Sequence, residues 1–147
     1  MEKDERMTSI KLHQADQIID QALATALSVK CDPISIAVLD AGGHLVAFRR
    51  QDNSGILRPE IAIGKAYGAL GFGIGSRALS GKNPTFLAAV SVAAGGRLVP
   101  VPGGVLIRAN DLVIGAVGVS GETSDTDELL AIAGIEGAGL MADAGRK

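Results

Sequence analysis

The sequence predicts a single-domain α+β protein, because amphipathic helices stand at both ends of the chain and short paired strands lie between them. With 147 residues the chain has room for one hydrophobic core, and a domain of this size buries roughly 68–70% of its unfolded surface. Hydrophobic residues make up 47% of the sequence and aromatic residues only 3%, so small aliphatic side chains have to fill that core. We place the domain at residues 8–147 and interpret residues 1–7 as a solvated tail.

Two helices are predicted in the first half of the chain. Apolar residues recur every three or four positions over residues 12–26, with Ser9 as the expected N-cap. A second helix is expected over residues 58–70, because Pro59 suits the first turn and Glu60 complements the positive end of the helix dipole. Glycines then interrupt the pattern.

Two more helices are predicted further along. Residues 84–94 restart a helix, which Gly95 and the glycine after it would end in a left-handed cap. The last helix is expected from about residue 126 to residue 141, and Asp125 and Glu128 have the spacing of a capping box before it.

The strands are expected to form antiparallel hairpins in one sheet, and the terminal helices are expected to cover one face of that sheet. A Gly-Gly turn joins the first pair, and Asn110-Asp111 joins the second. Residues 98–102 are also extended, because their prolines forbid a helix. The paired strands are residues 34–39 with 44–50, and residues 105–109 with 112–120.

Composition excludes several classes of function. A net charge of -2 with scattered lysines and arginines offers no surface for nucleic acid. One cysteine and two histidines cannot form an intramolecular disulfide or a Cys/His zinc site. The charged N-terminus lacks the apolar segment of a signal peptide, and no apolar run is long enough to cross a membrane. We therefore expect a cytoplasmic protein.

Four stretches, taken in order over about residues 8–142, resemble the GlcG/HbpS-like family, which also includes the C-terminal domain of PduO-type proteins. Most of them are glycine-rich turns that follow or precede a β-branched run. They are Ile36-Ala37-Val38-Leu39-Asp40-Ala41-Gly42-Gly43, Lys65-Ala66, Gly103-Gly104, and Ile114-Gly115-Ala116-Val117-Gly118-Val119-Ser120-Gly121 followed by Asp127-Glu128.

The resemblance implies a profilin-like α/β/α sandwich around a five-stranded antiparallel sheet, assembled into dimers or higher oligomers. It also implies haem as a possible cofactor, since some members of the family bind haem and others accompany catabolic pathways. We therefore expect a ligand-binding protein for haem or a related anionic metabolite.

A candidate anion site is suggested by Lys65, which stands in an otherwise apolar helix and has to pair or bind something. With Arg58 and Glu60 at the start of that helix, and with the amides of Gly103 and Gly104, it would form a pocket for a carboxylate. An ion pair between Lys65 and a carboxylate on another element is the alternative.

Haem iron needs an imidazole, phenolate or thiolate ligand, which leaves His13, His44, Tyr67 and Cys31. His13 lies beside the apolar stripe of the first helix and is the tentative choice. A solvated position on the flank of the helix is the alternative for this residue.

Two other functions stay open. In an enzyme that tautomerises or hydrolyses an oxo- or imino-acid, Arg58 would bind carboxylate, Lys65 would polarise a carbonyl and Asp127 would move a proton. Alternatively, the domain is an assembly partner of a pathway enzyme.

Residues 68–94 carry more apolar surface than one small sheet is expected to cover. We expect at least a dimer whose interface uses this segment. The alternative is that these residues cover the second face of the sheet.

Overall fold

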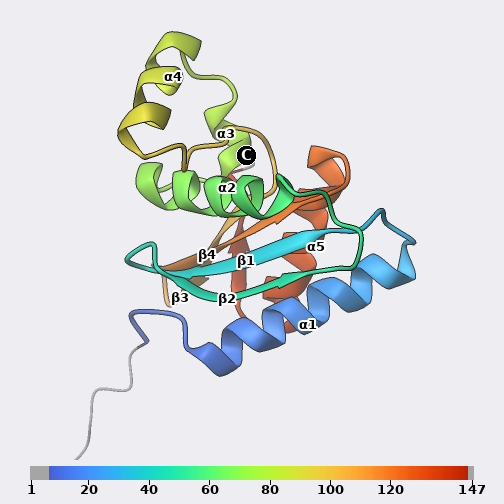
Figure 1. Cartoon of the computed structure of the whole chain (residues 1–147). Helices are drawn as coiled ribbons and strands as arrows, with labels where there is room; N and C mark the ends of the chain where they lie inside the picture. The colour runs from blue at the N-terminus through green and yellow to red at the C-terminus, as the bar shows by residue number, and fades with distance from the viewer. Residues whose placement is uncertain (1–6, 146–147) are drawn as a thin grey trace, which may run out of the picture.

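A computed structural model of the chain describes residues 7–145 and shows a five-stranded antiparallel sheet between two layers of helices (Figure 1). This confirms the predicted α+β class. The elements in chain order are α1 (Leu12–Ser28), β1 (Ser35–Asp40), β2 (Leu45–Arg50), α2 (Arg58–Phe72), α3 (Ser76–Leu79), α4 (Pro84–Ala93), β3 (Gly104–Ala109), β4 (Leu112–Ser120), α5 (Ser124–Gly137) and β5 (Met141–Asp143).

The sheet has the strand order β2-β1-β4-β3-β5, and every neighbouring pair is antiparallel. The two predicted hairpins supply four of the strands. In the second hairpin, Asn110 and Asp111 both have positive φ, as a tight two-residue turn requires. In the centre of the sheet Ser35 of β1 pairs with Ser120 of β4, so the start of β1 lies beside the end of β4.

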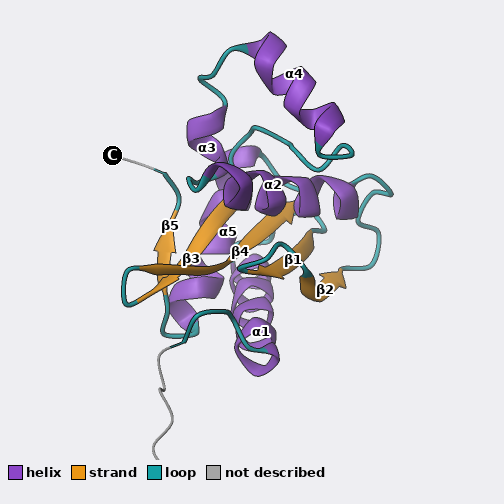
Figure 2. Ribbon diagram, turned by 90° about the vertical axis from the view of Figure 1, so that its left-hand side faces the viewer, coloured by secondary structure: helices purple, strands orange, loops and turns teal. Residues whose placement is uncertain are grey.

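Helices α1 and α5 pack together on one face of the sheet, and α2 packs on the other (Figure 2). The expectation that the terminal helices share a face is therefore confirmed. Helix α2 approaches the sheet closely because the strands present glycine beneath it. At Gly118 a Cβ atom would overlap the carbonyl oxygen of Ala62.

Helices α3 and α4 extend beyond α2 on the side away from the sheet (Figures 1 and 2). Residues 83–96 carry no charged side chain, yet Leu87 is the one buried residue of α4. Phe86 is 52% exposed and Val92 is 82% exposed. The second face of the sheet is covered by α2, so α4 carries an apolar surface that the rest of residues 7–145 does not cover.

Two local predictions were wrong. Ser9 does not cap α1, because its hydroxyl accepts a hydrogen bond from the Ala41 amide in the β1–β2 turn. The last helix ends at Gly137, and Met141 begins the short edge strand β5, which pairs with β3. Residues 98–102 contain no helix, as their prolines predicted, and they join α4 to β3 without pairing in the sheet.

No helix among residues 7–145 has the length and apolar character needed to cross a lipid bilayer.

Candidate functional site

The Lys65 ammonium lies at the end of the sheet where β4 finishes and β3 begins. It donates hydrogen bonds to Asp127 Oδ2 at 3.0 Å and to the Val119 carbonyl at 2.9 Å. The side chains of Lys65 and Asp127 are 2% and 1% exposed. A Cβ atom at Gly103 would lie 2.7 Å from Lys65 Nζ, so only glycine lets the backbone close over the ammonium. The structure thus contains the ion pair that the sequence left as an alternative.

Burial shifts the pKa values of both partners toward their neutral forms. Loss of solvent lowers the pKa of Lys65, and the nearby Arg58 charge adds to this, while Asp127 opposes it. Burial likewise raises the pKa of Asp127, against the charge of Lys65 and a hydrogen bond from the Glu122 amide. The pair is held in place by these contacts and is closed to solvent.

Around this ion pair, the expected ligand-binding groups take different positions. The amide of Gly104 donates to Ser76 Oγ at 2.7 Å, so its hydrogen bond is already made. Glu60 is exposed on the first turn of α2. Arg58 is partly buried, donates to Ser120 Oγ at 3.1 Å and has no ion-pair partner within residues 7–145. Arg58 is therefore the group at this end that an anion could reach.

Arg77 has a structural role that no pattern in the sequence indicated. Its guanidinium donates from Nε to Glu128 Oε2 at 2.9 Å and from Nη2 to Glu128 Oε1 at 3.2 Å, and it also binds Asp125. Hydrogen bonds to Glu128 and Asp125 raise the pKa of Arg77. The cap of α5 is instead Thr123, whose side chain accepts from the Thr126 amide, so the predicted capping box was wrong.

His13 lies apart from the Arg58 end of the sheet. It is exposed on the first turn of α1, whose start lies near the end of β1, where Ser9 contacts Ala41. Arg58 lies on the other face, near the start of β1. Within one copy of the chain, His13 and Arg58 therefore do not belong to one site.

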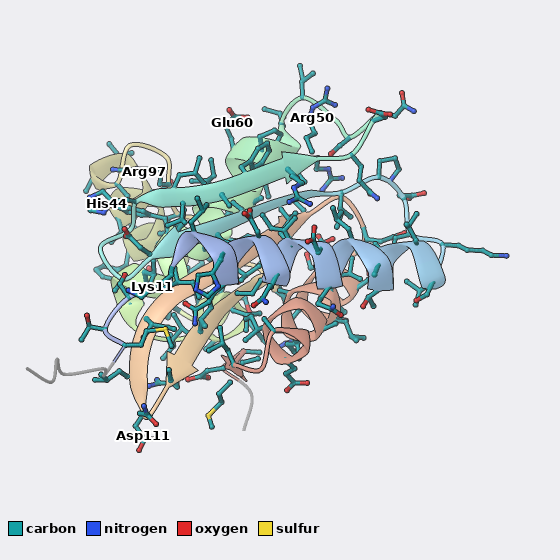
Figure 3. The ribbon with its side chains drawn as sticks, turned by 90° about the horizontal axis from the view of Figure 1, so that it is seen from below. Lys11, His44, Arg50, Glu60, Arg97 and Asp111 are labelled. Carbon is teal, nitrogen blue, oxygen red and sulfur yellow. The ribbon has the colours of Figure 1, made fainter. Side chains whose placement is uncertain are left out.

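Next to the β1–β2 turn the structure brings together two side chains, Tyr67 and Arg97, which we call the hairpin cluster. His44 belongs to the same turn, but its ring contacts Asp40. The Arg97 guanidinium lies 4.0 Å from the centre of the Tyr67 ring. The edge of that ring contacts the β1–β2 turn, because a Cβ atom on Gly43 would lie 2.9 Å from it. Figure 3 shows His44 and Arg97 at the same end of the molecule, whereas Arg50 lies at the far end of β2.

An apolar cavity of about 140 Å³ adjoins this cluster between α2 and α4. Arg97 has no ion-pair partner within residues 7–145; its Nε donates to the Ala94 carbonyl. The cavity thus combines an apolar wall with one uncompensated positive charge. Its lining is Tyr67, Gly68, Gly71, Phe72, Val90, Ala94, Arg97 and Leu98.

Two larger hollows have linings that are less suited to binding an anion or a metal ion. One of about 460 Å³ lies between Leu87 of α4 and Pro100 and is lined mainly by aliphatic groups. Another of about 480 Å³ is lined by Cys31 and Arg50, among others. Burial, with the charges of Glu122 and other acids, raises the pKa of the Cys31 thiol, which disfavours the thiolate that iron would need. Within residues 7–145 no cluster of three or more His, Cys, Asp or Glu side chains could hold a metal ion.

Together, the antiparallel sheet, the α/β/α layers and the glycine-lined contact of α2 with the sheet define a small domain of the α+β class. Residues 10–136 match the family model described as "Haem degrading protein HbpS-like". The chain therefore belongs to the HbpS-like family, as its resemblance predicted.

Named relatives cover nearly the whole chain. A protein of Citrobacter freundii, described as an uncharacterized 15.0 kDa protein in the dhaT-dhaS intergenic region, is 31% identical over 133 residues, covering 89% of this chain and 93% of the relative. The crystal structure of Klebsiella pneumoniae protein ORFY has a TM-score of 0.81 at 26% identity, over 95% of this chain and 97% of that one. The PduOC:heme complex has a TM-score of 0.81 at 22% identity, over 90% and 96%, and shares the fold.

Proposed function

We propose that this chain is a cytoplasmic ligand-binding protein for haem or a smaller anionic metabolite, and that it works as an oligomer. The single observation that carries the proposal is Arg97, which has no carboxylate partner within residues 7–145 and stands over Tyr67 at an apolar cavity. A ligand with an apolar body and a carboxylate matches both parts of this arrangement. Membership of the HbpS-like family and the fold shared with a haem-bound relative support haem as the first ligand to test.

The groups present fit haem in their chemistry. Haem propionates favour cationic donors, which Arg97 supplies, and the macrocycle favours apolar side chains such as those that line the cavity. Bound haem would supply an iron centre for ligand binding or electron transfer, while the chain's own residues bind and orient it.

The size of the cavity favours a site shared between copies. At about 140 Å³ it is smaller than the 300–1,000 Å³ typical of pockets for drug-sized ligands. Its α4 wall belongs to the helix whose apolar surface this chain does not cover. A second copy packed against α4 would enlarge the wall around the ligand and bury Phe86 and Val92.

Titration of the purified protein with hemin, followed by absorption spectroscopy and light scattering, tests the proposal. We expect a saturable shift of the Soret band with one haem per chain or per pair of chains. Arg97→Gln should weaken binding, whereas Arg49→Gln, which removes a cation paired with Asp20 on the other side of the sheet, should not. No saturable shift with hemin would overturn the haem proposal.

A second candidate function is the small enzyme acting on an oxo- or imino-acid, and one observation favours it. The buried pair of Lys65 and Asp127 has pKa values displaced toward neutrality, as in many acid–base sites. Arg58 lies nearby, and its guanidinium has N–H groups that its hydrogen bond to Ser120 Oγ does not use. Catalysis would require an opening of the Gly103 segment, because both side chains are at most 2% exposed. Turnover lost in Asp127→Asn would support this function.

A further inference from the structure

We propose that the cavity beside Tyr67 and Arg97 binds a small monocarboxylate whose apolar body has about the volume of a benzene ring, with its carboxylate at Arg97. The inference rests on the proposed function and narrows the ligand of one copy of the chain to the smaller of the two anionic classes. Three features carry it: the origin of the cavity, its size and the unused donors of Arg97.

The first step concerns how the cavity arises along α2. At Gly68 a Cβ atom would lie 2.6 Å from Leu98 Cδ1, so the segment that follows α4 packs directly on the helix there. One turn further on, a Cβ atom at Gly71 would have no heavy atom of residues 7–145 within 4 Å, apart from its chain neighbours and the nearby helix backbone. The space that Leu98 fills at Gly68 is therefore left empty at Gly71, between α2 and Val90 of α4.

The second step concerns the size and the lining of this space. At about 140 Å³ it is close to the apolar cavity of about 150 Å³ that, in another protein, stays dry and binds benzene. Its walls include the rings of Tyr67 and Phe72 and the aliphatic side chains of Val90 and Leu98. A ring or branched chain of about five or six carbons fits such a space, whereas a porphyrin exceeds it within one copy of the chain.

The third step concerns the cation at the cavity. Gly95 and Gly96, with φ of +66° and +84°, follow α4 and turn the chain back onto α2. Arg97 Nε donates to the Ala94 carbonyl at 3.0 Å and the guanidinium lies 4.0 Å from the centre of the Tyr67 ring, so the side chain is held from two sides. Its two Nη groups make no hydrogen bond with residues 7–145. They can therefore donate to a carboxylate in the two-pronged contact that guanidinium groups favour.

Isothermal titration calorimetry with three probes tests the two parts of the ligand. We expect cyclopentanecarboxylate, whose ring has about the volume of benzene, to bind saturably at one site per chain. Cyclopentylmethanol has the same ring without the charge and should bind about 10–100-fold more weakly, the usual effect of losing a hydrogen bond between charged groups. Acetate has the carboxylate without the ring and should show no saturable binding over the same concentrations.

Two variants test the two parts of the site. Arg97→Gln should weaken the binding of cyclopentanecarboxylate by about 10–100-fold. Gly71→Leu, which adds a side chain where the space is empty, should weaken it by about tenfold or more.

Lys82→Gln and Gly81→Leu are the matched controls. The Lys82 ammonium also lies near a ring of the lining, 5.9 Å from that of Phe72, and a Cβ atom at Gly81 also has open space around it. Neither residue belongs to the lining of the cavity. Both controls should change the affinity by less than about threefold.

Tyrosine fluorescence supplies a second readout at the site itself. Tyr67 is the one tyrosine of the 147-residue sequence, which has no tryptophan. Cyclopentanecarboxylate is transparent where tyrosine absorbs, so its binding should change the emission of Tyr67 with the dissociation constant that calorimetry gives. Acetate should leave the emission unchanged.

The outcomes separate this inference from the proposed function. An unchanged protein that binds hemin but not cyclopentanecarboxylate would overturn the inference and leave the proposed function in place. Binding that persists undiminished in Arg97→Gln or in Gly71→Leu, each shown to be folded by circular dichroism, would also overturn the inference, as would equal affinities for the carboxylate and the alcohol. Failure to bind hemin or either carboxylate would overturn both.

Discussion

Lys65 Nζ and Asp127 Oδ2, 3.0 Å apart, connect helices that lie on opposite faces of the sheet. Helix α2 carries the lysine and the first turn of α5 carries the aspartate, so the contact passes around the end of β4. Taking two charges out of water is costly, and the cost is offset only when the pair is close and fully hydrogen-bonded. Both conditions hold here, because Asp127 also accepts from the Glu122 amide.

Removing one member of this pair should strongly destabilise the fold. We expect Lys65→Met to lower the free energy of unfolding by about 3–5 kcal/mol, because Asp127 would be left buried without its counter-charge. The double variant with Asp127→Asn should lose less than the sum of the single changes, by about 0.5–3 kcal/mol. Urea unfolding measures both effects.

A matched control for this prediction is Lys82→Met, at an exposed lysine whose ammonium lies 5.9 Å from the Phe72 ring. Its effect should stay within about 0.5 kcal/mol. Equal effects of the changes at positions 65 and 82 would contradict a stabilising role for the buried pair.

The contact of Arg77 with Glu128 should depend on the shape of the guanidinium. Arg77→Lys keeps the charge but cannot reproduce the two-pronged contact, and we expect a loss of about 1.5–3 kcal/mol in urea unfolding. Arg108→Lys provides the comparison, because Arg108 pairs with the partly exposed Asp143 through one contact, from Nε at 2.7 Å. There the expected loss is about 0.2–1 kcal/mol. The prediction is wrong if the two losses are the same.

The sequence predicted those features of the fold and the site that have a local pattern, such as a turn or a periodic apolar run. The bounds of β4 were predicted correctly because the Asn110-Asp111 turn and a long β-branched run mark them. Lys65 was identified as a candidate because a lysine in an apolar helix requires an explanation. Strand β5 was missed, since three residues after a helix give no periodic pattern.

The contacts between distant residues could not be predicted. Arg77 and Glu128 are 51 positions apart, and only the fold reveals that they meet. Glu128 and Asp125 have the spacing of a cap, so the local explanation was sufficient without any distant partner. His44 was one of four possible iron ligands in the sequence. Its contact with Asp40 depends on the geometry of the turn, although the Asp-x-Gly-Gly-His spacing is a signal that could have suggested it.

The stability of the protein should fall in acid partly through Asp40. The folded-state pKa of this carboxyl lies below its unfolded value, despite burial, because of hydrogen bonds from His44 and Gly42. A lowered pKa contributes stability that is complete above the unfolded pKa of about 3.9 and is lost as the pH falls through the folded value. We expect Asp40→Asn to cost about 1 kcal/mol at pH 7 and progressively less below pH 4.

Urea unfolding between pH 7 and pH 3 measures this difference, and exposed Asp52→Asn serves as the control. A cost of Asp40→Asn that stays constant over the whole range would contradict the assignment.

The last prediction concerns α4, which we expect to pack against a second copy of the chain. A helix of ten residues is marginal by itself, and only Leu87 of α4 is buried within this chain. Its uncharged surface, with Phe86 and Val92 exposed, needs apolar cover. Phe86→Glu would place a charge in that contact and should convert the oligomer to single chains at micromolar concentration. Leu129→Glu is the matched control, because Leu129 is similarly exposed at 59% but lies on α5. Light scattering gives the mass: a single chain in the unchanged protein would refute assembly, and an unchanged mass in Phe86→Glu would place the interface elsewhere.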